Sequence, residues 1–389
     1  MKKTLLGILI ASSLMVSGQK KIDVSAELEK IQFQYKYLLK KHSDISKIPH
    51  SLHTDGTYRS LPSDWWCSGF FGASLWYLYE YSQQPYWKAA AHKWTMAVER
   101  EQYNTTTHDL GFMVYYPFGH GYRLTGDTTY RRILLQGAKS LLTRFDARRN
   151  VIKSWDEFKG YSFPVIIDNM MNLDYLTWAA RESKNNSFYS AAAAHADQTI
   201  KHHFREDFSS YHVVCYAPDG SVEAKKTHQG AADESAWARG QAWALYGFTM
   251  MYRETRDKRY LQQAVKIADF LINHPALPAD KIPYWDYNAP AIPAEERDVS
   301  AAAIMASALL ELKEYVPANA SLMYHNWAEE ILVSLCSPVY RNKGTEQGGF
   351  LLKHSVGHKP GRIEVDVPLI YADYYFIEAL LRYQKSGKL

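Results

Sequence analysis

The sequence predicts an all-α fold, an (α/α)6 toroid, on the basis of three observations. Helical segments recur as a weak internal repeat, in which a helix that is apolar on nearly all sides is followed by an amphipathic one. Short polar linkers join the two helices of a repeat, whereas long segments lead to the next repeat. The helix expected near the N-terminus has a partner only if it pairs with the last apolar helix. A closed ring provides that pairing, and an open helical solenoid is the alternative.

The six apolar segments are expected to form an inner ring of buried helices. They span residues 68–81, 110–124, 170–182, 236–254, 299–315 and 367–383. The amphipathic helices, which would form an outer ring, span residues 24–41, 87–101, 130–145, 189–204, 260–273 and 322–336.

The connections that precede the inner helices are long and rich in Trp, Gly, Pro and acidic residues. Because short and long connections alternate, all the long ones lie on one face of the predicted toroid, and long loops in compact domains are often functional. Residues 211–216 are expected to add a short strand pair there. The N-termini of the inner helices point toward the same face with unpaired N–H groups and positive dipole ends, which favours an anion-binding site at its centre.

The N-terminal segment has the pattern of a signal peptide. Lys2 and Lys3 precede a mostly apolar run over residues 5–16, and small residues follow at 17–18. The run is too short to span a bilayer. We therefore expect residues 1–18 to be removed and residues 19–389 to form a single catalytic (α/α)6 domain, periplasmic or secreted and with no membrane contact after removal.

Charge and cysteine usage exclude several classes of partner. Loss of Lys2 and Lys3 takes the formal charge from +4 to about +2, so no nucleic acid partner is expected. The three cysteines, Cys67, Cys215 and Cys336, are odd in number and far apart, which argues against a zinc site or a disulfide framework. We expect free thiols, no metal, no cofactor, and a monomer or weak homo-oligomer.

Two acidic residues, Asp109 and Asp168, stand directly before apolar helices. Helix capping alone would explain either position. The wider pattern favours chemistry on a sugar, because the chain has 29 Tyr and 11 Trp, whose rings can stack on sugar faces. Arg239, one turn into an inner helix, would match a carboxylate. A wall of Trp65, Trp66, Trp155, Trp237 and Trp243 completes a predicted pocket for an anionic sugar.

These residues form motifs that resemble a known family. The motifs are Trp66 with Gly69-Phe70, residues 108–112 (HDLGF), residues 168–173 (DNMMNL), Gln229-Gly230 and residues 235–243 (SAWARGQAW). From about residue 25 to its C-terminus the chain resembles the unsaturated glucuronyl hydrolases, glycoside hydrolase family 88. The resemblance implies the (α/α)6 fold. It also implies removal of the C4=C5-unsaturated uronic acid that polysaccharide lyases leave at the non-reducing end of glycosaminoglycan oligosaccharides.

The resemblance further implies roles for individual residues. Asp168 matches the general acid/base, and Asp109 matches the carboxylate that assists it. Substrate contacts are implied at Trp66, Phe70, His108, Trp155, His212, Gln229, Trp237, Arg239, Trp243 and Lys359. Residues 354–360, which include Lys359, lie where relatives contact a sulfate on the neighbouring sugar. The serines expected in that loop are not in register here, so a preference for sulfate stays open.

Protonation of a vinyl ether requires Asp168 to carry a proton at the start of the reaction. To protonate C4 of the double bond, this residue must start as the neutral acid, and hence needs a raised pKa. Burial and the charge of Asp109 would raise the pKa, whereas a helix N-terminus would lower it. We expect the first two effects to dominate.

Three other activities remain open on sequence grounds. One is an unsaturated rhamnogalacturonyl or other pectin-type uronyl hydrolase. The second is an inverting glycosidase that acts on a saturated glycan, and the third is a toroid that binds sugars without catalysis.

Overall fold

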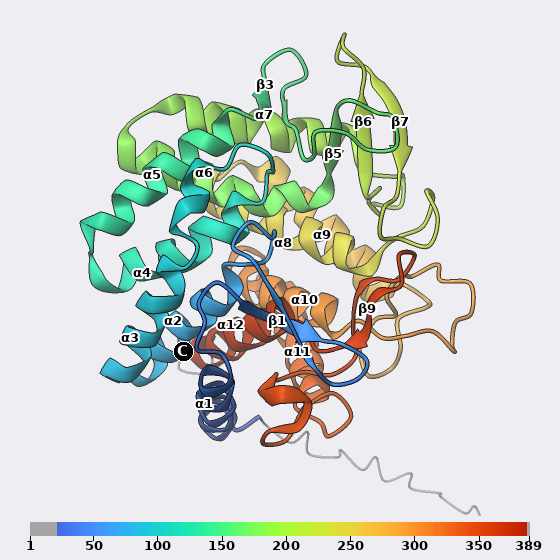
Figure 1. The fold of residues 1–389 in the computed structure, drawn as a ribbon. Coiled ribbons are helices and arrows are strands. Elements are labelled where there is room, and N and C mark those ends of the chain that lie inside the picture. The colour runs from blue at the N-terminus through green and yellow to red at the C-terminus, as the bar shows by residue number, and fades with distance from the viewer. Residues whose placement is uncertain (1–21, 387–389) are drawn as a thin grey trace, which may run out of the picture.

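The computed structural model describes residues 22–386 as two concentric rings of helices (Figure 1). The inner helices are α2 (Phe70–Ser82), α4 (Tyr116–Thr125), α6 (Leu173–Ser183), α8 (Ala238–Thr255), α10 (Val299–Leu312) and α12 (Ile370–Ser386). The outer helices are α1 (Val24–Lys41), α3 (Pro85–Met96), α5 (Thr128–Leu142), α7 (Asn186–His202), α9 (Lys258–Asn273) and α11 (Ala318–Leu335). The predicted signal peptide lies outside the described residues, so its removal stays a prediction.

The inner ring is closed. The helices α2 and α4, α6 and α8, α8 and α10, and α10 and α12 pack against each other, and the segment Gly111–Tyr115 that leads into α4 packs against α6. In addition, α12 packs against α2, and α1 packs against α12. The contact between α12 and α2, helices from opposite ends of the sequence, distinguishes a toroid from a solenoid. The predicted (α/α)6 fold is therefore confirmed, and the solenoid alternative is wrong.

Three of the short linkers share one construction that reverses the chain sharply. Four inner helices end at a residue in the left-handed region; at α2 this residue is Gln83 (φ 55°), and no side-chain cap follows it. At α4, α6 and α8 the left-handed residues are Gly126 (φ 70°), Lys184 (φ 60°) and Arg256 (φ 60°). The residue that follows each of them is Asp or Asn, whose side chain accepts a hydrogen bond from the first turn of the outer helix. Local sequence thus determines these turns.

Two inner helices begin irregularly, in the segments that carry the acids. A π-helix, η2 (Gly111–Tyr115), precedes α4, and a 3-10 helix, η3 (Ile167–Asn172), precedes α6. The sequence predicted plain α-helices there. Such irregular turns occur frequently at functional sites.

The long connections carry short strands and further 3-10 turns. The hairpins are β1 (Ile48–Leu52) with β2 (Tyr58–Leu61), β3 (Phe145–Asp146) with β4 (Val151–Ile152), and β8 (Ser355–His358) with β9 (Ile363–Val367). An antiparallel sheet is formed by β5 (Pro164–Ile166), β6 (Val213–Tyr216) and β7 (Val222–Lys226). The segment 211–216, expected to form a short strand pair, thus supplies the central strand of three. The remaining 3-10 helices are η1 (Glu99–Tyr103), η4 (Lys313–Tyr315) and η5 (Glu346–Gly349). The last inner helix begins at Ile370 rather than 367, because Val367 belongs to β9.

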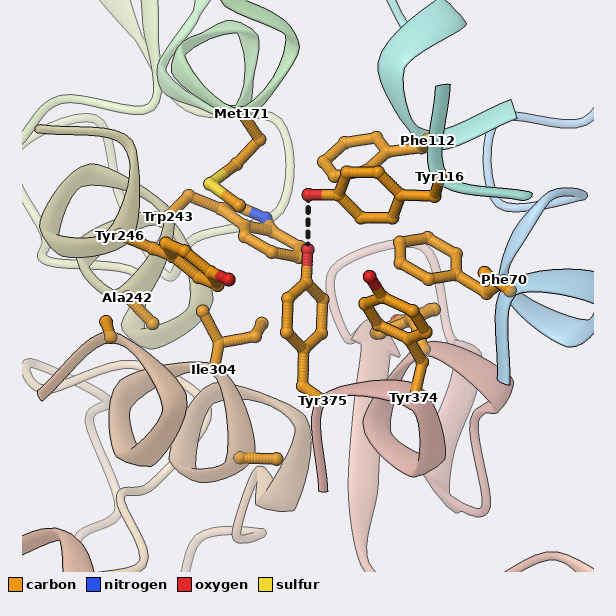
Figure 2. Packing of buried hydrophobic residues seen from close by; sticks show 14 of the residues in the cluster. Phe70, Phe112, Tyr116, Met171, Ala242, Trp243, Tyr246, Ile304, Tyr374 and Tyr375 are labelled. Carbon is orange, nitrogen blue, oxygen red and sulfur yellow. Dashed lines mark hydrogen bonds between the residues drawn. The ribbon is translucent and has the colours of Figure 1, made fainter. Parts of the chain in front are cut away.

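Aromatic side chains from several inner elements fill the axis of the ring (Figure 2). Phe70, Phe112 and Trp243 meet there, and the hydroxyls of Tyr116 and Tyr375 form a hydrogen bond of 2.9 Å. Below this core, at the end with the short linkers, is a cavity of about 580 Å³ whose charged residues largely pair with one another, as Arg253 does with Asp174, Glu254 and Glu311. The core separates that cavity from the face with the long connections.

All three cysteines are free thiols, as predicted. None of the helices in the described part of the chain has the length and apolarity that crossing a bilayer requires.

Close packing of inner elements can be tested at Gly69. A Cβ atom at Gly69 would lie 2.1 Å from the carbonyl oxygen of Phe112 and 2.7 Å from that of Met113, and backbone atoms cannot rotate away. We expect Gly69→Ala to lower the free energy of unfolding by roughly 1–3 kcal/mol in urea denaturation. The control is Gly119→Ala within α4, whose new Cβ meets only the Tyr115 side chain at 3.3 Å. Equal losses in both variants would contradict this explanation.

Candidate active site

A cavity of about 360 Å³ opens among the long connections, at the N-terminal ends of the inner helices. Its volume suits a small molecule. The residues that line it are Arg59, Asp64, Trp65, Trp66, Thr107, Asp109, Trp155, Ile166, Asp168, His228, Gln229, Arg239, Gly357, His358, Ile363, Glu364 and Tyr371. The structure therefore brings the two predicted acids into one cavity.

A single hydrogen bond ties together the two segments that carry the acids. The backbone N–H of Gly111, two residues after Asp109, donates to Asn172 Oδ1 over 2.8 Å, and Asn172 lies one turn after Asp168. A Cβ at Gly111 would lie 2.4 Å from the same oxygen, so only glycine permits this approach. The glycine and asparagine of the two motifs thus hold the acids in register.

Neither acid caps a helix with its side chain. The cap of η3 is Ile166, and Asp168 lies in its first turn with Oδ2 buried and without a hydrogen-bond partner among the described residues. Asp109 Oδ2 accepts a hydrogen bond of 2.6 Å from the hydroxyl of Thr107, and no side-chain cap is formed at the start of η2. The capping explanation, open on sequence grounds, fails for both.

Two buried histidines stand behind the acids. His108 Nε2 lies 3.2 Å from Asp109 Oδ1, and His212 Nε2 lies 3.8 Å from Asp168 Oδ2. His212 Nδ1 accepts hydrogen bonds from the backbone N–H groups of His228 and Gln229, each over 3.2 Å. Because burial lowers the pKa of His212 well below its usual value, the ring is neutral and its one proton is on Nε2, facing Asp168.

Burial controls the protonation of both acids. It raises the pKa of Asp168 to about 7; the nearby Asp109 raises that pKa too, whereas Arg239 and the backbone N–H of Asp168 lower it. Burial also raises the pKa of Asp109 to about 7, against the lowering effects of Thr107 and Arg144. As expected from the sequence, burial and like charge outweigh the helix N-terminus at Asp168.

Arg239 reaches the cavity but is largely occupied by protein groups. Its Nη1 donates to Asp298 Oδ2 over 3.0 Å and to the carbonyl of Val356 over 2.6 Å, and its Nη2 donates to the carbonyl of Gly357 over 2.7 Å. Asp298 caps α10, so this buried pair fixes α8 against α10 and β8. The sequence predicted a guanidinium free to bind a carboxylate. The structure shows one whose charge is already paired.

The other predicted contacts divide into two groups. Trp66, Trp155 and Gln229 line the cavity, as does Trp65 of the predicted wall. Phe70, His108, His212, Trp237 and Trp243 are buried and lie outside the set of residues that line it. Trp237 stacks near His212 at 4.4 Å between ring centroids, and Trp243 packs on Phe112 in the core, so both support the site from behind.

Lys359 lies outside the cavity lining. Its ammonium group pairs with Glu295 and Glu296 and lies 5.4 Å from the ring centroid of Trp285. The two carboxylates compensate its charge.

The cavity also contains residues that sequence reasoning missed, among them Arg59, Glu364 and Tyr371. Tyr371 lies at the start of the last inner helix, and its ring centroid is 5.0 Å from that of Trp66. Its position at the start of an inner helix, as for the predicted acids, could have identified it from the sequence. Arg59 and Glu364 come from separate hairpins, and nothing in the local sequence distinguishes them from surface charges. The described residues contain no group of three His, Cys, Asp or Glu side chains that converges to hold a metal.

The buried acids make stability depend on pH. Since each pKa is raised above the value of about 3.9 for an unfolded Asp, folding favours the protonated forms. Their stabilising contribution is fully present below about pH 4 and is lost as the pH rises through 7. We therefore expect Asp168→Asn to raise the free energy of unfolding at pH 8 by on the order of 1–3 kcal/mol, with no gain at pH 4. Urea denaturation at both pH values measures this, and an equal gain at both would exclude ionisation as its cause.

Comparisons with known proteins agree with this geometry. The chain is 40% identical to an unsaturated glucuronyl hydrolase of Formosa agariphila over 98% of its own length and 96% of the relative's. Its fold matches the crystal structure of an unsaturated glucuronyl hydrolase specific for heparin, with a TM-score of 0.91, 45% identity and coverage of 94% and 98% of the two chains.

A second similar structure is that of a variant of the unsaturated glucuronyl hydrolase of Streptococcus agalactiae in complex with dGlcA-GalNAc6S. Its TM-score is 0.81, its identity 27%, and the match covers 95% and 94% of the two chains. A search of protein-family models gave no match. Identity of 40% to the Formosa agariphila enzyme over nearly the whole chain is more than a shared fold alone would give. This protein therefore belongs to the unsaturated glucuronyl hydrolases, which are glycoside hydrolases.

Proposed function

We propose that this protein removes the C4=C5-unsaturated uronic acid from the non-reducing end of lyase-generated glycosaminoglycan oligosaccharides. The observation that carries the proposal is the pair of buried carboxyl groups, Asp109 and Asp168, in one cavity of a chain of this family. The cavity is closed at its inner end by the aromatic core, so it suits the end of a chain rather than its middle.

The first step is protonation of carbon. With a pKa raised to about 7, Asp168 is substantially neutral at and below neutral pH and can donate its proton to C4 of the vinyl ether. Positive charge then develops at C5, next to the ring oxygen. Once Asp168 has lost its proton, its carboxylate supplies negative charge at the floor, which stabilises that cation.

In the second step, water attacks C5 while the Asp168 carboxylate accepts its proton, which restores the acid. The product at C5 is a hemiketal, and its ring opening gives a ketone at C5 and a hemiacetal at C1. Collapse of that hemiacetal breaks the C1–O bond, which releases the leaving sugar and leaves an aldehyde at C1 of the open-chain uronic acid. Neutral His212 lies beside the Asp168 carboxyl group, with its Nε2 at 3.8 Å from Asp168 Oδ2. Trp66 and Trp155 line the cavity, where their rings are within reach of the sugar.

The relatives support glycosaminoglycan fragments as the substrate class. One similar enzyme is specific for heparin, and a variant of another was crystallised with dGlcA-GalNAc6S. Pectin-type unsaturated uronides are the second candidate. Turnover of unsaturated disaccharides from chondroitin, hyaluronan, heparin and pectin, followed by loss of the near-ultraviolet absorbance of the double bond, separates the two classes.

Replacement of the acid tests the role of Asp168. We expect Asp168→Asn to lower kcat for a good unsaturated disaccharide by about a hundredfold or more, since the amide cannot donate the proton. The matched control is Asp257→Asn on the opposite face, where the Asp caps α9 and Asn caps equally well. Near-normal turnover by Asp168→Asn would remove this residue from the mechanism.

The position of the new oxygen atom tests the reaction itself. In water enriched in heavy oxygen, the proposed hydration places the label at C5 of the released uronic acid. Mass spectrometry of fragment ions locates it. Label at C1 would instead indicate ordinary glycosidic attack.

A further inference from the structure

The active-site cavity has a buried floor and a more exposed mouth. Asp109, Asp168 and Arg239 are at most 7% exposed, whereas Trp65 and Ile363 are 41% and 43% exposed. If the unsaturated sugar meets the two acids at the floor, the sugar that leaves lies toward the mouth. This assignment rests on the proposed function.

Arg59 lies at this mouth, and its guanidinium has N–H donors that no protein group among the described residues accepts. Its side chain is 26% exposed, and its Nε lies 3.2 Å from Glu364 Oε1. Within residues 22–386, neither terminal nitrogen of Arg59 has a protein hydrogen-bond partner. The two cations that the sequence predicted to bind anions differ from Arg59 in this respect. The charge of Arg239 is paired with Asp298, and that of Lys359 is paired with two glutamates.

Glu364 is held firmly in place. His50 Nε2 lies 2.5 Å from Glu364 Oε1, and His50 Nδ1 lies 3.1 Å from Cys67 Sγ. Burial alone would raise the pKa of Glu364, but His50 and Arg59 lower it below its usual value, so the carboxylate is ionised. Glu364 adopts a φ of 57°, in the left-handed region that side-chain-bearing residues rarely occupy. Strain of this kind persists where the surroundings impose it, and it concentrates at functional sites.

The ion pair joins hairpins from opposite ends of the chain. Arg59 belongs to β2 and Glu364 to β9, and the β1–β2 hairpin is attached to the segment after β9 by the Ser51–Leu369 bridge. Figure 1 shows β1 and β9 side by side. The hydroxyl of Ser51 also donates to the carbonyl of Pro368 over 2.7 Å. The guanidinium is thus fixed to a rigid part of the mouth.

We propose that Arg59 binds a sulfate group on the sugar that leaves, and that Glu364 positions Arg59 for this role. A guanidinium held at Nε presents its remaining N–H groups as a fork that matches two oxygens of an oxyanion. Because the side chain is already ordered, little conformational entropy is lost on binding. Asp64, an acid of the same mouth, repels a sulfate on its own side and so confines the anion to the side of Arg59.

The test compares substrates that differ only in sulfate. Unsaturated disaccharides without sulfate and with one sulfate at N2, O4 or O6 of the hexosamine are assayed with wild type, Arg59→Gln and Arg59→Lys. For at least one sulfated disaccharide, we expect Arg59→Gln to raise KM about tenfold or more, as loss of a charged hydrogen bond would. The KM of the unsulfated disaccharide rises by less, so the ratio of the two KM values shifts in favour of the unsulfated substrate. Arg59→Lys, which keeps the charge but loses the fork, falls between.

A double-mutant cycle tests the positioning role of Glu364. Glu364→Gln raises the KM of the same sulfated substrate, and in the Arg59→Gln background it has no further effect on the preference for sulfate. The control is Arg297→Gln, whose side chain is 25% exposed and pairs with Asp280 at 2.9 Å away from the cavity lining; it leaves the preference unchanged.

The outcomes separate this proposal from the proposed function. If Arg59→Gln affects sulfated and unsulfated disaccharides equally, or affects neither, Arg59 does not read sulfate, although the hydrolase activity stands. If wild type turns over no unsaturated disaccharide, the proposed function fails and this proposal fails with it.

Discussion

Closure of the inner helical ring around an aromatic core is the constraint on which the site depends. The packing of α12 against α2 completes the ring, and side chains such as Phe70, Phe112 and Trp243 fill its axis. The cavity therefore ends in a floor that water reaches from one side only. Burial at that floor is the largest cause of the raised pKa values of Asp109 and Asp168, so the fold itself sets the proton affinity of the acids.

A few hydrogen bonds between distant segments convert this general arrangement into a defined geometry. The Gly111–Asn172 bond aligns the segments of the two acids. The carbonyl oxygen of Gly357 accepts hydrogen bonds from both Arg239 and Gln229, over 2.7 and 2.8 Å, and so joins α8 and the loop after β7 to the β8 hairpin. Each junction uses a backbone group on one side. Each junction therefore depends on the residue type at one position: a glycine at 111, and a buried polar side chain at 239.

Several buried polar atoms around the acids lack partners among the described residues. They include Asp168 Oδ2, His212 Nε2 and Trp243 Nε1. An unpaired buried polar atom costs roughly 1–3 kcal/mol, so a group of them at one place needs a reason. All three lie at or behind the floor of the cavity, and one of them belongs to Asp168, the acid proposed to donate the proton.

The sequence by itself determined the elements and their order, because the relevant signals are local. The left-handed residue followed by an Asp or Asn cap at Gly126, Lys184 and Arg256 fixes the short linkers, and apolar composition identifies the inner helices. The acids Asp109 and Asp168 were found in the same way, from their place before those helices. Only the tertiary structure decided which charges are free. The pairing of Arg239 with Asp298, of Lys359 with Glu295 and of Arg59 with Glu364 depends on contacts between residues far apart in the chain, and an ion pair leaves no local signal in a sequence.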